Sequence, residues 1–138
     1  MKVVLDTDVL VAGLKSSLGA SFRLILLVKA GQVKPAVTTP LLVEYESVLN
    51  RPQMVAPTLG LEDIAGFLDW FVSISTRHRV HYLWRPHLPD PQDDLVLEAA
   101  MAAGARYLIT FNLRHFRDLA SLGIVVLTPG QFLKHLQL

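Results

Sequence analysis

Seven of the twelve acidic side chains in this sequence fall in three short segments. They are Asp6 and Asp8, Glu44 and Glu46, and Asp90, Asp93 and Asp94. Carboxylates that folding brings together repel one another and raise one another's pKa unless a cation lies among them. Oxygen ligands suit Mg²⁺ and Mn²⁺, hard ions that retain several waters in protein sites. Such an ion activates water and stabilises charge on a phosphoryl oxygen, so these segments indicate metal-assisted hydrolysis of a phosphodiester.

The composition limits the class of protein. The chain has 138 residues and a mass of 15.3 kDa, which is typical of one domain, here residues 1–138. A net charge of +1 and a hydrophobic content of 51% exclude intrinsic disorder. The absence of cysteine excludes a disulfide scaffold, thiol catalysis and cysteine-bound zinc. The weak net charge disfavours a protein that coats nucleic acid, but not a nuclease whose metal ions neutralise an acidic pocket.

Short apolar runs alternate along the chain with helical periodicity. Strands are predicted at 3–5, 33–38, 80–84, 107–110 and 124–127, and helices at 20–30, 39–49, 61–74, 90–103 and from 128 to the end. Thr39 is predicted to cap its helix with Pro40 at the first position, and Gly31 and Gly104 are natural helix stops. Strands alternating with helices predict an α/β fold, a three-layer α/β/α sandwich around a central, mainly parallel sheet.

The predicted topology brings several polar side chains to one edge of that sheet. Ligands of an open parallel sheet gather beyond the carboxyl ends of its strands. Asp6 follows the first strand, Glu44 lies in the helix after the second, and Asn112 follows the strand that ends at Thr110. Asp93 joins them if the N-terminus of its helix points the same way.

Each acid also has an ordinary structural explanation. Asp6 and Asp8 are typical turn or capping residues, and most glutamates, such as Glu44, are solvated. The run 90–94 fits a helix cap with Asp90 at the N-cap and Asp93 at the third helical position. The run 128–131 has the same layout with a neutral third residue, Gln131, so capping does not require a carboxylate there. The acids taken together exceed what capping needs.

The ordered motifs resemble those of the PIN-domain ribonucleases. They are Asp6-Thr7-Asp8 after an opening strand, a helical Glu44, Asp90-Pro91-Gln92-Asp93-Asp94, the run 104–110 and Asn112. Within that family the chain is similar to the toxins of bacterial and archaeal toxin–antitoxin pairs, which the ending at 123–133 also matches. The resemblance covers essentially the whole chain.

The resemblance assigns roles to individual residues. Asp6, Glu44 and Asp93 match the family's metal-binding acids, and Asp93 is chosen because the third acid falls eleven residues before the glycine at the helix end, here Gly104. Asn112 stands where many relatives have a fourth acid. Two departures are Asp8, where the family more often has Asn, and His115, where several relatives have Asp. They leave the number of metal ions and the fourth ligand open.

The resemblance also implies an activity. Asp6, Glu44, Asp93 and Asn112 are the expected catalytic residues, and the three acids are expected to hold Mg²⁺ or Mn²⁺. Water activated at the ion would attack an RNA phosphate in line, leaving a 5′-phosphate and a 3′-hydroxyl. Residues expected to support the metal ligands or orient water are Asp8, Asp90, Asp94 and Thr110. Residues expected to contact RNA phosphates, unless they are merely solvated, are Arg114, His115 and Arg117.

The expected partners follow from the same resemblance. They are the RNA substrate, a cognate antitoxin that covers the acidic cleft, and a second copy of the chain in a homodimer. The longest apolar run, 24–28, is far short of the roughly 20 residues that a membrane-spanning helix needs. We therefore expect a cytoplasmic protein without a membrane partner.

Two other functions fit parts of the sequence. The run 4–9 is similar to the first motif of haloacid-dehalogenase-type phosphatases, with Asp6 as the nucleophile and Asp8 as the acid. That family needs a Thr or Ser, then a Lys, then an acidic pair, whereas here the acids at 90–94 precede Thr110 and no lysine lies between Lys34 and Lys134. The other alternative is a domain that binds RNA or a partner protein without cleavage.

Overall fold

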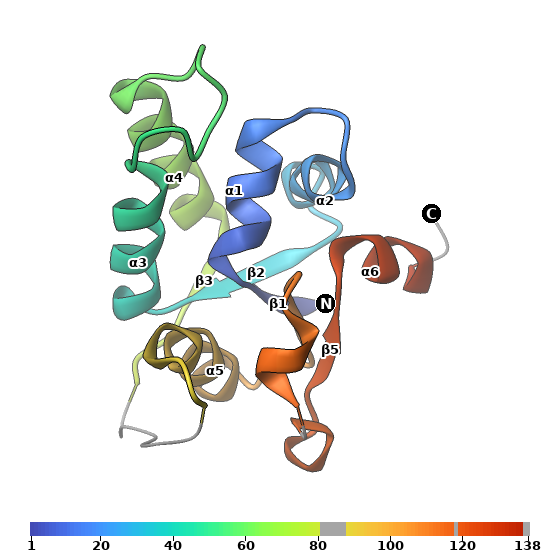
Figure 1. Ribbon diagram of the computed structural model, residues 1–138. Coiled ribbons are helices and arrows are strands. Elements are labelled where there is room, and N and C mark those ends of the chain that lie inside the picture. Colours follow the sequence, from blue (N-terminus) through green and yellow to red (C-terminus); the bar gives the residue numbers. More distant parts are fainter. Residues whose placement is uncertain (81–87, 118, 137–138) are drawn as a thin grey trace.

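A parallel sheet forms the centre of the computed structural model, which describes residues 1–80, 88–117 and 119–136 (Figure 1). Its strands are β1 (Lys2–Leu5), β2 (Lys34–Val37), β3 (Thr76–Arg77), β4 (Tyr107–Ile109) and β5 (Val125–Leu127). Their order is β3-β2-β1-β4-β5, and all four pairings are parallel. The chain thus builds outward from β1 in both directions, and the order reverses between β1 and β4. In open α/β sheets this reversal is where ligands bind.

Helices cover both faces of the sheet. They are α1 (Thr7–Lys15), α2 (Ala20–Lys29), α3 (Thr39–Leu49), α4 (Leu61–Ile74), α5 (Pro91–Ala103) and α6 (Pro129–His135), with short 3₁₀ turns η1 (Leu113–Phe116) and η2 (Leu119–Leu122). The α5 helix packs on β1, β2 and β4, while α1, α2 and α6 lie on the opposite face (Figure 1). The α3 and α4 helices stand side by side where β2 ends. The predicted three-layer α/β/α sandwich is confirmed.

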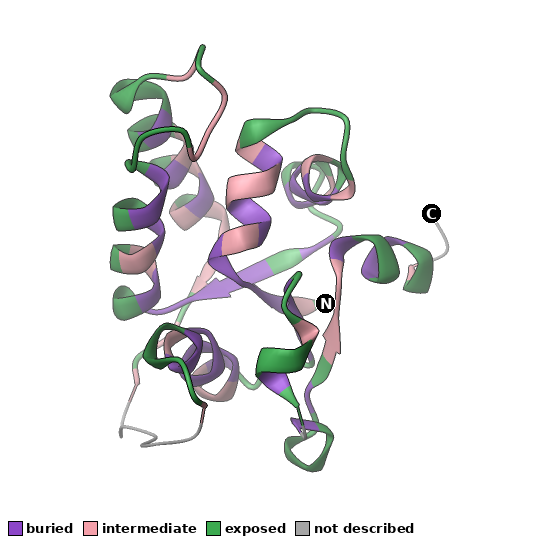
Figure 2. Cartoon of the chain, viewed as in Figure 1, coloured by how far each residue is buried: buried purple, intermediate pink, exposed green. Residues whose placement is uncertain are grey.

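The core lies along the central strands, and burial decreases outward through the helices (Figure 2). Val3, Val4 and Leu5 of β1 are fully buried, as an apolar run covered on both faces requires. Thr110, directly after β4, is also fully buried. A polar side chain at such a place needs a hydrogen-bond partner, and the partner of Thr110 is Asp6.

Most element boundaries match the sequence-based predictions, and the exceptions have local causes. The helix predicted to be capped by Thr39 is capped instead by Thr38, which is extended and accepts a hydrogen bond from Leu41 N. The strand predicted at 80–84 lies almost entirely outside the described residues, and the third strand is Thr76–Arg77. The helix α1 was not among the predicted helices. Asp6 is its N-cap, so the capping interpretation of Asp6 is correct alongside any other role.

No single helix in the described ranges is long and apolar enough to cross a membrane. The helices α1 and α2 reach the necessary length and composition only when taken together, as a pair bent by 99°.

The backbone conformation at the end of α5 can be tested by substituting Gly104. Gly104 adopts the left-handed conformation there, with φ 60° and ψ 34°. A side chain costs about 1 kcal/mol in that conformation, so Gly104→Ala is expected to lower the free energy of unfolding by about that amount, measured by urea denaturation. Gly66→Ala is the matched control, because Gly66 is an exposed residue inside α4 with open space around it. That change is expected to stabilise the protein by about 0.5 kcal/mol or more. Equal effects of the two changes would contradict this assignment.

Candidate active site

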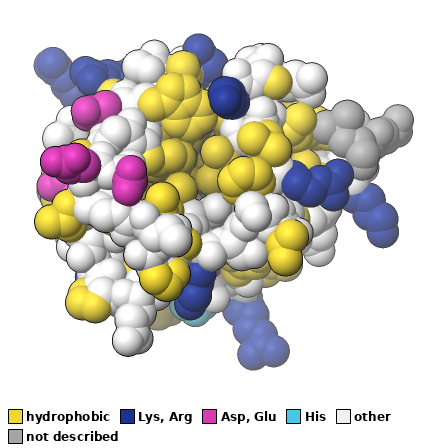
Figure 3. Space-filling view, turned by 90° about the horizontal axis from the view of Figure 1, so that it is seen from above, with side chains coloured by type: hydrophobic (Ala, Val, Ile, Leu, Met, Phe, Trp, Pro, Cys, Tyr) yellow, Lys and Arg dark blue, Asp and Glu magenta, His cyan; other side chains and the backbone are white. Residues whose placement is uncertain are grey.

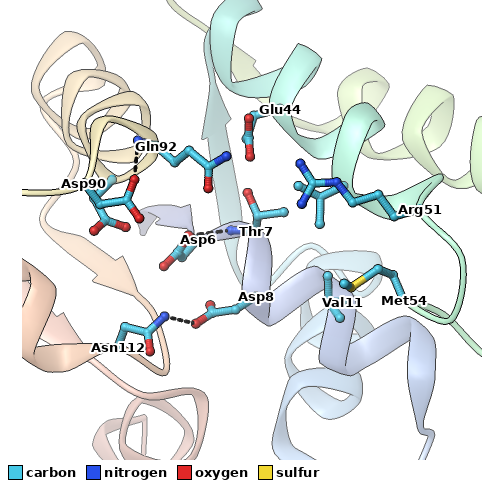
Figure 4. A pocket seen from close by; sticks show the side chains of 12 residues that line it. Asp6, Thr7, Asp8, Val11, Glu44, Arg51, Met54, Asp90, Gln92 and Asn112 are labelled. Atoms are coloured by element: carbon cyan, nitrogen blue, oxygen red, sulfur yellow. Dashed lines mark hydrogen bonds between the residues drawn. The ribbon is translucent and has the colours of Figure 1, made fainter.

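An acidic cleft opens at the carboxyl ends of the central strands, at the point where the strand order reverses (Figure 4). Its volume is about 270 Å³. The polar residues that line it are Asp6, Thr7, Asp8, Glu44, Arg51, Asp90, Gln92, Asp93 and Asn112. They come from the end of β1, from α1, from α3 and the residues after it, from the start of α5, and from the turn after β4. Segments far apart in the sequence therefore meet here.

The pairing of β1 with β4 places Asp6. Leu5 lies opposite Ile109, and Asp6 N donates to Ile109 O at 2.8 Å, so the next residues, Asp6 and Thr110, are also neighbours. Thr110 Oγ1 donates to Asp6 Oδ2 at 2.7 Å, and Thr7 N donates to Asp6 Oδ1 at 2.7 Å. Both carboxylate oxygens are thus bound, and the side chain is held in one orientation at the floor of the cleft.

Asp8 and Asn112 form a second polar pair beside Asp6 (Figure 4). Asn112 Nδ2 and Phe111 N donate to Asp8 Oδ2 at 3.0 and 3.2 Å. Asn112 N in turn donates to Thr110 Oγ1 at 3.0 Å. The side-chain amide of Asn112 therefore donates a hydrogen bond to Asp8, which stands where the family more often has Asn. An acid at position 112 would instead repel Asp8.

The start of α5 carries three acids with three different environments. Asp90 is exposed and caps the helix by accepting a hydrogen bond from Gln92 N at 3.0 Å. Asp93 is buried and lies 2.9 Å, Oδ2 to Nδ1, from His115. Asp94 accepts a hydrogen bond from Leu88 N at 3.2 Å, and it does not line the cleft. Of the acids at 90–94, Asp90 and Asp93 therefore belong to the cleft.

The opposite wall of the cleft is formed by α3. Glu44 is half-buried and projects toward the cleft, with Arg51 beside it (Figure 4). The next residue, Tyr45, is fully buried and donates its hydroxyl hydrogen bond to Leu5 O, at the end of β1. This bond fixes the rotation of α3 about its axis, so Glu44 is directed to the same strand end that carries Asp6.

Burial and mutual repulsion disturb the acids of the floor. Burial raises the pKa of Asp6, although its bonds from Thr110 and Thr7 oppose the rise. Burial and the neighbouring charge of Asp6 raise the pKa of Asp8 to about 7. Burial also raises the pKa of Asp93, against the opposing charge of His115. The cause in each case is a carboxylate that is short of water and close to others of like charge.

The carboxylate oxygens at the floor of the cleft are suitable ligands for a divalent cation. Asp8 Oδ1 and Asp93 Oδ2 are buried, and neither accepts a hydrogen bond of normal geometry from the described part of the chain. A buried carboxylate oxygen without a donor is costly, and an oxygen-binding cation satisfies it. Within 1–80, 88–117 and 119–136, however, no three Asp, Glu or His side chains lie close enough to hold one ion directly. The arrangement suits an ion that takes one or two protein ligands and completes its shell with water and phosphate, as Mg²⁺ commonly does.

Comparison with known proteins identifies the family. The PIN domain family matches residues 2–114, which include the cleft residues of all the walls. The chain belongs to the PIN domain family. A solved structure, described as VapBC2 from Rickettsia felis bound to a DNA fragment from their promoter, has a similar fold with a TM-score of 0.58. The identity is 18%, and the match covers 91% of this chain and 97% of that chain. No curated protein matches the sequence.

The cleft of this PIN domain contains most, but not all, of the predicted site residues. Asp6, Asp8, Glu44, Asp90, Asp93 and Asn112 line it, and Thr110 lies behind Asp6. Arg114, His115 and Arg117 are exposed, and none of them lines the cleft. Arg51 lines it but was not predicted. Arg51 follows Glu44 by seven residues, or two helical turns, and this spacing could have indicated that both lie on the same side. The α3 helix itself ends before Arg51, at Leu49.

A second hollow of this PIN domain has different chemistry. It lies between α1, α2 and α4, has a volume of about 320 Å³, and is lined almost entirely by apolar side chains such as Leu14, Phe22 and Trp70. Seen from above, hydrophobic side chains gather near the middle of the surface, with Lys and Arg around them (Figure 3). No carboxylate is among the described residues that line this hollow, so the cluster of acids belongs to the first cleft alone.

The raised pKa values predict how stability depends on pH without divalent ions. The folded state favours protonated Asp8, so its stabilisation is full below the ordinary pKa of 3.8 and is lost as pH rises through about 7. Asp8→Asn in EDTA is therefore expected to raise the melting temperature by a few degrees at pH 8 and much less at pH 4.5. The amide oxygen of Asn can still accept the bonds from Asn112 and Phe111. Asp69→Asn, at an exposed position of α4, is the control and should show no such pH dependence. Equal gains from Asp8→Asn at both pH values would contradict the prediction.

Proposed function

We propose that this PIN domain is a divalent-metal-dependent endoribonuclease and the toxin of a toxin–antitoxin pair. The observation that carries the proposal is the meeting of Asp6, Asp8, Asp93 and Glu44 in one cleft, with buried carboxylate oxygens that lack donors from the described residues. PIN domains are generally nucleases that use divalent ions, and the motifs of this chain resemble the ribonucleases among them.

Asp6, Glu44 and Asp93 are the proposed metal-holding residues, with one or two of them as direct ligands of an ion and the others bound to it through water. A bound Mg²⁺ or Mn²⁺ would activate water and stabilise charge on the phosphate. Asp6 is prepared for this role because Thr110 and Thr7 hold both its oxygens in place before any ligand arrives. Glu44 faces it from α3, and Asp93 faces it from the first turn of α5.

Other residues of the cleft orient water and substrate. Asp8, fixed through Oδ2 by Asn112, presents Oδ1 as an acceptor for a water proton. Arg51 supplies a guanidinium on the Glu44 side, where it can pair with a phosphate oxygen of the RNA backbone. Arg114 and Arg117 flank the opposite side as exposed cations for neighbouring phosphates.

The toxin role and its partners rest on similarity. The fold is similar to that of a chain in the VapBC2 structure, and the motifs resemble toxin components. We therefore propose an antitoxin that covers the acidic cleft and inserts an Arg or Lys among its carboxylates, since an unpaired cluster of acids attracts such a group. The homodimer stays a prediction.

Removal of the central carboxylate tests the nuclease activity. Asp6→Asn keeps the size and one of the two hydrogen-bond acceptors, but removes the charge that holds a cation. It is expected to lower the rate of RNA cleavage in Mg²⁺ or Mn²⁺ by at least about 100-fold, with loss of toxicity in cells. Asp69→Asn should cleave RNA at the wild-type rate. Wild-type protein that binds RNA but does not cleave it with any divalent ion would instead support a binding domain.

Removal of the Thr110 hydroxyl tests the orientation of Asp6. Thr110→Val is nearly isosteric and deletes the donor to Asp6 Oδ2. The change is expected to raise the pKa of Asp6 further and to lower RNA cleavage about 10- to 100-fold. The accompanying readout is a shift of the pH–rate profile to higher pH, since more Asp6 is protonated at a given pH. A lowered rate with an unshifted profile would contradict this role and indicate a general loss of folding.

A further inference from the structure

His115, in the 3₁₀ turn η1, contacts the buried Asp93 of α5. Its Nδ1 atom lies 2.9 Å from Asp93 Oδ2, and the side chains of His115 and Asp93 are 47% and 10% exposed. His115 belongs to η1, whereas Asp93 belongs to the first turn of α5. The imidazole is thus half-exposed and lies directly against Asp93, one of the proposed metal-holding acids that line the cleft.

The contact has the separation of an ion pair. Asp93 Oδ2 accepts no other hydrogen bond from the described residues, and the charge and hydrogen bonding of His115 both counter the rise in the pKa of Asp93. Two ligand atoms at right angles on an octahedral ion, with bonds of about 2.1 Å, lie about 3 Å apart. The separation of His115 Nδ1 and Asp93 Oδ2 fits this arrangement.

Contacts at both ends of η1 hold the backbone of His115 in place. His115 N donates to Asn112 O at 3.0 Å, and the side chain of Asn112 donates to Asp8 at 3.0 Å. The following residue, Phe116, is buried in the core with 2% of its surface exposed. One end of η1 is therefore bonded to the cleft and the other end is packed into the core, so little conformational freedom remains to be lost when a ligand binds.

We propose that His115 is a nitrogen ligand of a divalent ion that Asp93 also holds, and that this ligand makes the site select Mn²⁺ over Mg²⁺. The inference rests on the proposed function, because it concerns the ion of the acidic cleft. Imidazole suits transition metals, whereas Mg²⁺ takes oxygen ligands. A carboxylate in place of His115 would add another negative charge beside Asp6, Asp8 and Asp93, so a neutral ligand also reduces repulsion.

The test measures metal binding directly, using the full chain and Mn²⁺ alone. Pulsed EPR of the Mn²⁺ complex is expected to show coupling to a histidine ¹⁴N nucleus in the wild type and to lose it in His115→Asn. The control His135→Asn, in α6 next to Tyr107, should retain the coupling. By calorimetry, His115→Asn is expected to lower Mn²⁺ affinity about tenfold or more and to change Mg²⁺ affinity less than about twofold. Melting curves of the variants without metal verify that each is folded.

The possible results separate this inference from the proposed function. Mn²⁺ bound without nitrogen coupling, or bound as tightly or more tightly by His115→Asn, would show that His115 is only a counter-charge, while the metal site itself would stand. An equal loss of Mn²⁺ and Mg²⁺ affinity would overturn the selectivity. If the wild type binds no Mn²⁺, or if Asp6→Asn and Asp93→Asn bind it as the wild type does, both proposals are wrong.

Discussion

The parallel pairing of β1 with β4 is the constraint on which the acidic cleft depends. The pairing continues one residue past both strands, because Asp6 N donates to Ile109 O, and this brings Asp6 next to the Thr110 hydroxyl. The surrounding segments start from this pair of strand ends. The α1 helix begins at Asp6, and the turn that carries Asn112 and His115 begins after Thr110. A change of register here would separate the acids, whatever their identity.

The clustered carboxylates of the cleft lower the stability of the folded protein, although the proposed function requires them. Carboxylates that are short of water and close to one another raise the pKa of Asp6, Asp8 and Asp93, and this opposes folding at neutral pH. Hydrogen bonds from Thr110, Thr7 and Asn112 offset part of the cost. In the proposed function a divalent ion offsets the rest, so the same charges that destabilise the empty cleft would make it bind the ion.

The sequence could predict the features that depend on local patterns. Apolar runs that end in Asp6 and Thr110 indicate strand ends, and Asp90 before Pro91 indicates a helix start, because each pattern has a local physical cause. It could not predict the features that depend on how separate elements pack. Whether Asp93 or Asp94 faces the cleft depends on the rotation of α5, which the family spacing supplied and local patterns did not. The contact of His115 with Asp93 needs the position of η1 against α5, and the two-residue strand β3 is too short to leave a pattern.

The buried hydroxyl of Tyr45 has a mechanical consequence. Because it is bonded to Leu5 O, the strand end that leads into Asp6 also anchors the helix that carries Glu44. The strand end that leads into Asp6 and the helix that carries Glu44 are thus joined through the core. This bond limits how far α3 can move away from the strand end. In the proposed function, the substrate would have to fit the opening between them.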